Sequence, residues 1–121
     1  ITWGKILHKT IQACEEAKKI NIDVELIDIR SLSPLDEEAI FKSVRKTNRC
    51  VVVEENWPVA SVGSYIIERI QTECFDDLDA PVKKVSQANV PVPYSEILEN
   101  QVLPSVENIM EAIKGVSYYK L

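Results

Sequence analysis

One stretch, residues 24–58, most constrains what this chain can fold into. It opens with an apolar run at residues 24–30 and closes with another at 50–54, and both runs are rich in β-branched residues. Such runs are typical of strands that are buried on both faces of a sheet. The residues between them have helical spacing. A strand, a helix and a second strand within about 30 residues join parallel strands, so the stretch predicts a parallel sheet.

The helix inside this stretch has two candidate starts. Asp36 can cap it, because aspartate is a favoured residue at the start of a helix. The two glutamates that follow Asp36 also suit the positive end of the helix dipole. Ser33, with Pro34 at the first helical position, is the competing start. Cationic side chains gather at the other end, where they also suit the dipole: Arg45, Lys46 and Arg49. This charge is therefore better explained by the helix end than by a binding patch.

Three more apolar stripes predict amphipathic helices, at residues 5–20, 62–74 and 104–116. Ser61 can cap the second of these helices, and Pro104 or Ser105 can open the third. Gly63 lies in the first turn of the second helix, where it lowers helix propensity. We expect Gly63 to allow a neighbouring segment to approach the backbone closely.

The remaining segments complete an α/β pattern. Residues 82–86 predict a short strand, and residues 89–94, with two prolines spaced by one residue, predict an extended surface segment. We expect Gly115 to fray the last helix, leaving residues 116–121 as a tail. Helices that alternate with strands predict a three-layer α/β/α sandwich with a mostly parallel sheet, built as one domain across residues 1–121.

Length and charge exclude several classes of protein. The chain has 121 residues, enough for about one domain with its own core. Its formal net charge of −5 argues against a nucleic-acid surface, which needs a basic stripe. No apolar run approaches the roughly 18 residues of a membrane span. The sequence opens at Ile1 without a methionine and like the tail of a strand, so we expect a domain cut from a longer protein, with its first strand truncated.

No set of residues forms a self-sufficient active site. With three glycines, neither a dinucleotide fingerprint nor a phosphate-binding loop is feasible. The single histidine, His8, is expected to be structural or solvent-facing. Cys14, Cys50 and Cys74 form no close pair and are expected to be small buried thiols rather than zinc ligands. We therefore assign no catalytic, cofactor-binding or metal-binding residue.

Two adjacent glutamates lie where a binding site would be expected. Glu54 and Glu55 follow a predicted strand, at the edge where ligands of α/β sheets usually bind. A catalytic pair is conceivable, but solvated or salt-bridged acids are favoured because no partner base or electrophile is in view. From its residues alone, the chain is best interpreted as a domain for assembly or docking.

Several motifs occur in an order and spacing that point to a known family. They are residues 24–36, Lys46-Thr47-Asn48, residues 53–58, Leu78-Asp79-Ala80-Pro81 and Val90-Pro91-Val92-Pro93-Tyr94. Together they resemble the transketolase C-terminal domain, in the form found in beta subunits of 2-oxo acid dehydrogenase decarboxylating components. Trp57-Pro58 and the Pro-x-Pro-Tyr segment are similar to the pyruvate dehydrogenase branch. Ser33 departs from the arginine or asparagine that the motif commonly carries.

The resemblance implies an activity that belongs to a larger subunit. That subunit would decarboxylate pyruvate and reductively acetylate lipoyl groups, feeding acetyl-CoA formation, in a heterotetramer with an alpha subunit and a second beta subunit. Thiamine diphosphate and magnesium would bind outside this domain. The location would be the bacterial cytoplasm or the mitochondrial matrix. The alternatives are the same domain of a branched-chain dehydrogenase, a transketolase or a deoxyxylulose phosphate synthase, and a free-standing doubly wound binding module.

The same resemblance gives a role to one aspartate. Asp79 would meet a basic residue of the peripheral subunit-binding domain of the dihydrolipoyl acyltransferase core. From sequence alone, Asp79 can also be interpreted as a turn aspartate that caps local backbone. Trp57, with Pro58, is expected either to fill a core or domain contact or to anchor a subunit interface. No role is assigned to Leu121.

Overall fold

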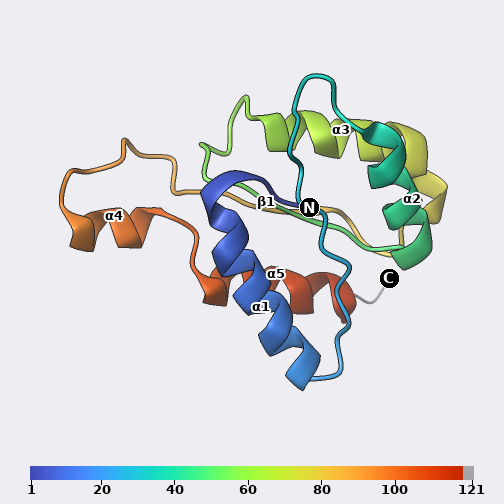
Figure 1. Cartoon of the computed structure of the whole chain (residues 1–121), viewed down its shortest axis with the longest axis horizontal. Coiled ribbons are helices and arrows are strands. Elements are labelled where there is room, and N and C mark those ends of the chain that lie inside the picture. Colours follow the sequence, from blue (N-terminus) through green and yellow to red (C-terminus); the bar gives the residue numbers. More distant parts are fainter. Residues whose placement is uncertain (119–121) are drawn as a thin grey trace.

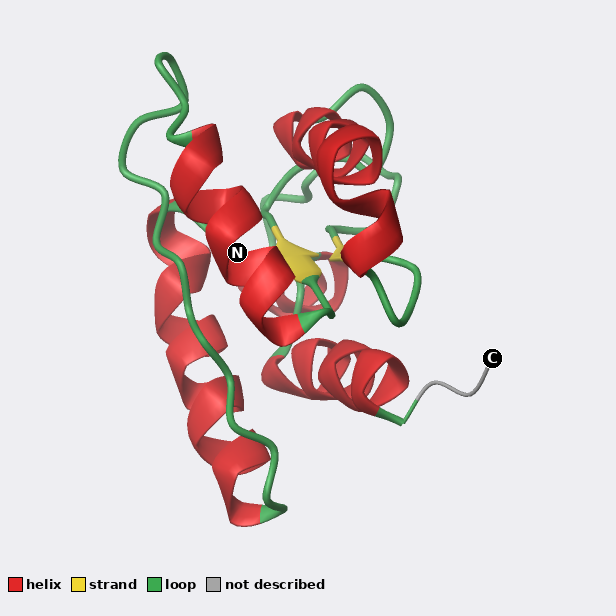
Figure 2. Ribbon diagram, turned by 90° about the vertical axis from the view of Figure 1, so that its right-hand side faces the viewer, coloured by secondary structure: helices red, strands yellow, loops and turns green. Residues whose placement is uncertain are grey.

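A short parallel sheet lies between two pairs of helices in the computed structural model, which describes residues 1–118 (Figure 1). On one face pack α1 (Leu7–Lys19) and α5 (Val106–Ser117), and on the other pack α2 (Glu37–Thr47) and α3 (Val62–Cys74). Each pair buries an apolar cluster of its own. Figure 2 shows the strands enclosed between these helices. The predicted three-layer α/β arrangement is confirmed.

The regular strands are β1 (Val51–Val53) and β2 (Lys83–Val85), which pair in parallel with Val52 opposite Lys84. Side chains along β1 face opposite layers. Val52 belongs to the cluster shared with α2 and α3, whereas Val53 belongs to the cluster shared with α1 and α5. Both side chains are buried, as the β-branched run predicted.

Residues at the start of the chain lie in the middle of the sheet. Thr2 forms parallel bridges to Asp28 on one side and to Val53 on the other. Its N–H donates to the Ile27 carbonyl at 3.0 Å, and its hydroxyl donates to the Val53 carbonyl at 3.0 Å. The order across the sheet is therefore residues 27–29, residues 1–3, β1 and β2. Residues 1–3 take the place of a strand, as expected.

The strand predicted at residues 24–30 is wrong in its extent. Asp28 forms a bridge, but residues 24–27 belong to no regular strand. The neighbour of this segment in the sheet is residues 1–3, and the hydrogen bond from the Thr2 N–H to the Ile27 carbonyl places them opposite residues 27–29. Residues 24–26 consequently have no adjacent strand to pair with, whatever their own β-propensity.

Helix ends follow the sequence closely. Asp36 accepts a hydrogen bond from the Ala39 N–H at 3.1 Å, so α2 starts after Asp36 and the competing start at Pro34 is not used. Ser61 caps α3 and Ser105 caps α5, each through its hydroxyl oxygen. Left-handed asparagines follow two helices, as the αL preference of asparagine allows: Asn21 and Asn48. Short 3₁₀ turns, η1 (Gly4–Ile6) and η2 (Phe75–Asp77), complete the helical segments.

Residues 88–103 form a projecting arm, which contains a helix that the sequence analysis missed, α4 (Glu96–Val102) (Figure 1). The Ala88 N–H donates to the Val102 carbonyl at 2.9 Å and closes the base of the arm. Residues 89–94 belong to no helix or strand and are mostly exposed, so the predicted surface segment is confirmed. It is not extended throughout, because the chain bends at residues 89–90 and 94, and the Val90 N–H donates to the Ala88 carbonyl at 2.7 Å. Seven residues are too few to show a helical apolar stripe, which explains why α4 escaped prediction.

The last helix runs further than predicted. It continues through Gly115 to Ser117, because Val116 is buried and its packing outweighs the low helix propensity of the glycine. The predicted tail at 116–121 is thus wrong for its first two residues, and residues 119–121 lie outside the described part of the chain. Within residues 1–118, no helix is long and apolar enough to cross a membrane.

The three cysteines differ in how far their thiols are buried. Cys50 and Cys74 are buried in the cluster with α2 and α3, and burial raises the pKa of both thiols. Cys14 is partly exposed on α1, although partial burial raises its pKa as well. The expectation of small buried thiols is therefore confirmed for Cys50 and Cys74.

We predict that the native protein at pH 8 is alkylated by iodoacetamide at Cys14 well before Cys50 or Cys74. The pKa of all three thiols is raised, so the difference in rate comes from burial, which keeps the reagent away from Cys50 and Cys74. Peptide mass spectrometry after timed quenching measures each site, and the protein in 6 M guanidinium is the control in which all three react. Equal rates at Cys50 in the native and denatured protein would contradict the burial described here.

Candidate partner-binding surfaces

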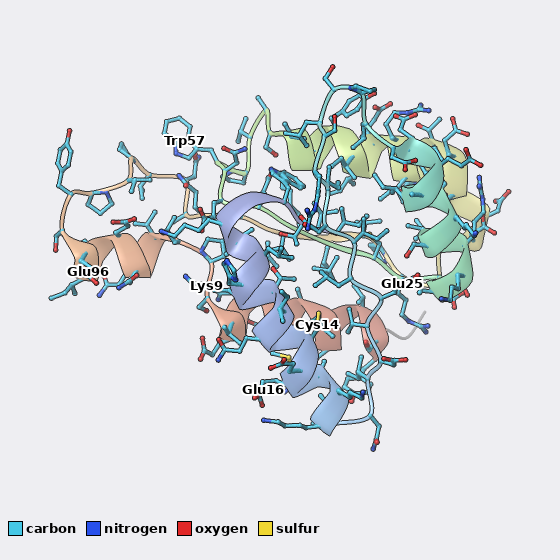
Figure 3. All side chains as sticks on the ribbon, in the orientation of Figure 1. Lys9, Cys14, Glu16, Glu25, Trp57 and Glu96 are labelled. Carbon is cyan, nitrogen blue, oxygen red and sulfur yellow. The ribbon has the colours of Figure 1, made fainter. Side chains whose placement is uncertain are left out.

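The predicted partner-binding residues lie at opposite ends of β1. Asp79 lies at the amino end, where its N–H bonds to the Asn48 carbonyl just before the strand. Trp57 and Pro58 follow the carboxyl end of the strand. Figure 3 places Trp57 on the same side of the molecule as the arm. The structure thus does not bring Asp79 and Trp57 together, and they belong to two separate surfaces.

The backbone around Asp79 is fixed by hydrogen bonds to the turn before β1. The Asp79 N–H donates to the Asn48 carbonyl at 2.8 Å, and the Asn48 side-chain amide donates to the Asp77 carbonyl at 2.8 Å. The side chain itself points outward and is 57% exposed. Within residues 1–118, the contact made by its carboxylate is an ion pair with Arg49. The geometry therefore presents Asp79 to solvent rather than using it as a turn cap.

Arginines already neutralise part of the acid on this surface. Arg49 Nη1 lies 3.6 Å from Asp79 Oδ2, and Arg45 Nε lies 3.5 Å from Asp77 Oδ2. Arg49 also donates from Nε to the Val116 carbonyl at 2.9 Å. Exposed ion pairs of this kind contribute at most about 1 kcal/mol. An incoming cation can therefore share the Asp79 carboxylate or displace Arg49 from it at little cost.

Sequence reasoning missed the place of Arg49 on this surface and made no prediction for two exposed aromatic residues, Phe75 and Tyr118. Arg49 was assigned to a helix end, yet it lies between Asp79 and the last turn of α5. Phe75 is exposed in η2, and Tyr118, the last described residue, is exposed beyond α5. Arg49 is remote from Asp79 in sequence and meets it only through the fold, so no local pattern could have paired the two. Phe75 lies four positions before Asp79 in the same connector.

The turn after β1 presents an aromatic side chain to solvent. Trp57 is 50% exposed and Val59 is more exposed still, so Trp57 is not a core residue of this chain. Ala60 has a φ of 54°, a left-handed conformation that is uncommon outside glycine and asparagine. A hollow of about 370 Å³ opens beside the turn, bounded on its other side by Gln87.

Lys84 fastens this turn to the sheet. Its ammonium group donates to the Pro58 carbonyl, to Ser64 Oγ at 2.6 Å and to Ser61 Oγ at 3.3 Å. Lys84 belongs to β2, whereas its acceptors belong to the turn and to the start of α3. One partly buried cation therefore joins three elements and fixes the turn that carries Trp57.

Beneath the turn, the Glu54 carboxylate is completely buried. It accepts hydrogen bonds from the Gly63 N–H at 3.0 Å and the Ser86 hydroxyl at 3.1 Å, and Lys84 Nζ lies 3.8 Å away. The salt-bridged interpretation is confirmed for Glu54, and the solvated one is wrong. Because its oxygens are held by structural partners away from solvent, the geometry does not support a catalytic pair with Glu55.

Gly63 makes the burial of Glu54 feasible. A Cβ at this position would lie 2.7 Å from both Cδ and Oε2 of Glu54, which is closer than real contacts of a Cβ. The predicted close approach at Gly63 is confirmed, and the approaching group is a carboxylate rather than backbone. This contact explains why a residue of poor helix propensity occupies the first turn of α3.

The rest of the described chain offers no assembled metal site. Within residues 1–118, no group of three or more histidine, cysteine, aspartate or glutamate side chains is arranged to hold a metal ion. His8 is exposed on α1. A cavity of about 400 Å³ lies between α1, α5 and β1, and its lining is mainly apolar.

Comparison with known proteins identifies several relatives. The family model described as the transketolase C-terminal domain matches residues 1–109. The chain is 44% identical over its whole length to pyruvate dehydrogenase E1 component subunit beta of Rickettsia conorii, and it covers 37% of that protein. It is 41% identical over 96% of its length to pyruvate dehydrogenase E1 component subunit beta-1, mitochondrial, of rice (Oryza sativa subsp. japonica), and it covers 31% of that protein. The chain thus spans about a third of the length of these relatives.

One solved structure has the same fold. It is described as a split gene transketolase, an inactive beta4 tetramer, and it superimposes with a TM-score of 0.81 over 95% of this chain and 37% of its own. The sequence identity is 24%, so the likeness extends to the fold alone.

We predict that Gly63→Ala lowers the free energy of unfolding by about 1–3 kcal/mol, because the new methyl group would crowd the Glu54 carboxylate. In a Glu54→Ala background the same substitution should cost much less, since the crowding group is gone. Urea unfolding of the four variants gives the coupling energy. Gly115→Ala is the matched control: a Cβ there meets open space, so stability should stay equal or rise. If Gly63→Ala lowered the free energy of unfolding equally with and without Glu54, the predicted clash with the Glu54 carboxylate would be contradicted.

Proposed function

Because the chain belongs to the family of transketolase C-terminal domains, we propose that it is a single domain, residues 1–121, of the beta subunit of a pyruvate dehydrogenase decarboxylating component. The observation that carries the proposal is the 44% identity along the entire chain to such a subunit. The complete subunit would decarboxylate pyruvate and reductively acetylate lipoyl groups, as a source of acetyl-CoA. It would act in the bacterial cytoplasm or the mitochondrial matrix.

The proposal places the cofactors outside this domain. Thiamine diphosphate needs a magnesium ion and groups that surround a diphosphate. The described residues do not fit this need: they offer no cluster of metal-ligating side chains, and the three glycines are too far apart for a phosphate-binding loop. The contribution of this domain to the reaction is therefore assembly and docking.

Asp79 is proposed as the contact for a basic docking module, the peripheral subunit-binding domain of a dihydrolipoyl acyltransferase. In support, its carboxylate is exposed and its contact with Arg49 is an exposed ion pair, which an incoming cation can share or replace at little cost. Hydrogen bonds at the Asp77 carbonyl and the Asp79 N–H fix the backbone that carries this carboxylate, which lowers the ordering cost of binding. The formal net charge of −5 would steer a basic partner toward the chain.

Trp57 and Pro58 are proposed as part of an interface within a heterotetramer of two alpha and two beta subunits. The support is a half-exposed tryptophan on a turn that Lys84 fastens from below. Aromatic side chains held rigidly at a surface are typical anchors of subunit interfaces. The surface near Asp79 remains free for docking, because it lies at the other end of β1.

We predict that the full-length subunit, co-expressed with its alpha subunit and supplied with thiamine diphosphate and magnesium, decarboxylates pyruvate in preference to branched-chain 2-oxo acids. The measurement is kcat/KM for each 2-oxo acid with an artificial electron acceptor. The full-length subunit purified without its alpha subunit serves as the control and should be inactive. A preference for the branched-chain substrates would assign the chain to the neighbouring enzyme of the family.

We also predict that Asp79→Ala in the full heterotetramer weakens binding of the matching subunit-binding domain at least about tenfold, because a charge pair at the interface is lost. Calorimetry at two salt concentrations measures the dissociation constant and its salt dependence. Asp76→Ala removes an exposed aspartate from the same connector and is the matched control, with an expected change of less than about twofold. Equal dissociation constants for the wild type and Asp79→Ala would eliminate the docking role.

A further inference from the structure

The arm, residues 88–103, contributes nothing to the core of this chain. Within residues 1–118, neither apolar cluster contains a residue of the arm. Its base is nevertheless held firmly: the Ala88 N–H donates to the Val102 carbonyl, and Lys9 Nζ donates to the Pro104 carbonyl at 3.0 Å. Buried residues flank the arm on both sides, Gln87 and Pro104. The arm is thus anchored at its ends and projects from the body (Figure 1).

Apolar side chains cover the projecting part of the arm. Tyr94 is completely exposed and Ile97 is 74% exposed. Three further apolar residues expose close to half of their surface: Val90, Val92 and Leu98. A concentration of exposed apolar residues in a segment that packs on no core marks an interaction site. The two prolines stiffen the segment and reduce the entropy that binding must remove.

The charge of the arm indicates which kind of surface it can bind. Residues 85–113 contain no lysine, arginine or histidine. Glu96 and Glu99 belong to α4, the same helix as the exposed Ile97 and Leu98, and Figure 3 shows Glu96 at its start. A complementary surface is therefore apolar at its centre and basic at its rim. A second copy of this chain carries the same acidic arm and a net charge of −5, so arm-to-arm contact would oppose like charges.

The arm is continuous with the turn that carries Trp57. The Gln87 N–H, just before the foot of the arm, donates to the Asn56 carbonyl at 3.1 Å, and the hollow of about 370 Å³ is lined by Gln87 and by residues of the turn. Figure 3 shows Trp57 and Glu96 on the same side of the molecule. The exposed turn and the arm thus lie at the same side of the molecule and are joined at Gln87.

We propose that the arm is a docking element whose exposed apolar side chains enter a groove on the alpha subunit, and that lysine or arginine residues line the rim of that groove. The choice of the alpha subunit rests on the proposed function. The apolar interior and the basic rim of the groove are inferred from the exposure and the charge of the arm alone. Contact at both Trp57 and the arm would hold the partner at two points on either side of the hollow.

The test uses the full-length subunit co-expressed with its alpha subunit. Tyr94→Ser combined with Ile97→Ser should raise the dissociation constant of the two subunits at least about tenfold, because apolar anchors are lost. Glu96→Lys combined with Glu99→Lys should raise it to a similar extent, and added salt should then strengthen the association rather than weaken it. Sedimentation velocity at several protein and salt concentrations gives these constants.

The matched control is Glu15→Lys combined with Glu111→Lys, which makes the same change of charge at exposed positions of α1 and α5. Its dissociation constant should change less than about twofold. Thermal unfolding of every variant checks the fold, and the arm variants should keep the wild-type midpoint because the arm lies outside the core. A photo-crosslinking amino acid in place of Tyr94 identifies the protein that the arm contacts.

Each outcome decides between the two proposals. If the tetramer is active and both arm variants assemble with unchanged constants, the docking role of the arm is wrong while the proposed function stands. Crosslinks from position 94 to a second beta subunit, or to no protein, would overturn the arm proposal as well. If the wild-type subunits neither associate nor decarboxylate pyruvate, the proposed function fails and the alpha-subunit partner fails with it. Crosslinks to the alpha subunit at basic peptides support the inference.

Discussion

The structure depends on one buried carboxylate, that of Glu54. It lies at the carboxyl end of β1 and meets the first turn of α3 through Gly63 and the β2 side through Ser86 and Lys84. Removing one partner of a buried charge pair costs several kcal/mol, so these contacts must form together. The same lysine that balances the carboxylate also holds the Pro58 carbonyl. The position of the turn that carries the exposed Trp57 is therefore coupled, through Lys84, to the burial of Glu54.

The length of β1 sets the spacing of the two surfaces. Three residues of strand span about 10 Å. Asn48 and Asp79 meet at its amino end, and the Trp57 turn follows its carboxyl end. Both ends are tied to a sheet that is packed between helix layers, so the surfaces keep a fixed relation to each other. Two partners can therefore occupy the domain at once without competing for the same side chains.

The sequence predicted features that depend on neighbours along the chain and failed where distant residues decide. The caps at Asp36, Ser61 and Ser105 were predictable because each hydroxyl or carboxylate bonds to a backbone N–H three residues away. The burial of Glu54 was not, because a glutamate after three valines has the same local pattern whether it meets water or a lysine 30 positions later. The pairing of Arg49 with Asp79 likewise depends on the crossover through α3. The strand at residues 24–30 was overextended because pairing requires a neighbour, which β-propensity does not report.

The two surfaces differ in the kind of association that their chemistry supports. Around Asp79 the contacts are exposed ion pairs, which salt screens and which exchange partners easily. Around the arm and Trp57 the exposed side chains are large and apolar, and their burial is insensitive to screening. Interfaces that persist are the more apolar ones, whereas exchangeable contacts are polar and are often steered by charge. The amino end of the sheet is therefore suited to reversible docking and the carboxyl end to permanent assembly.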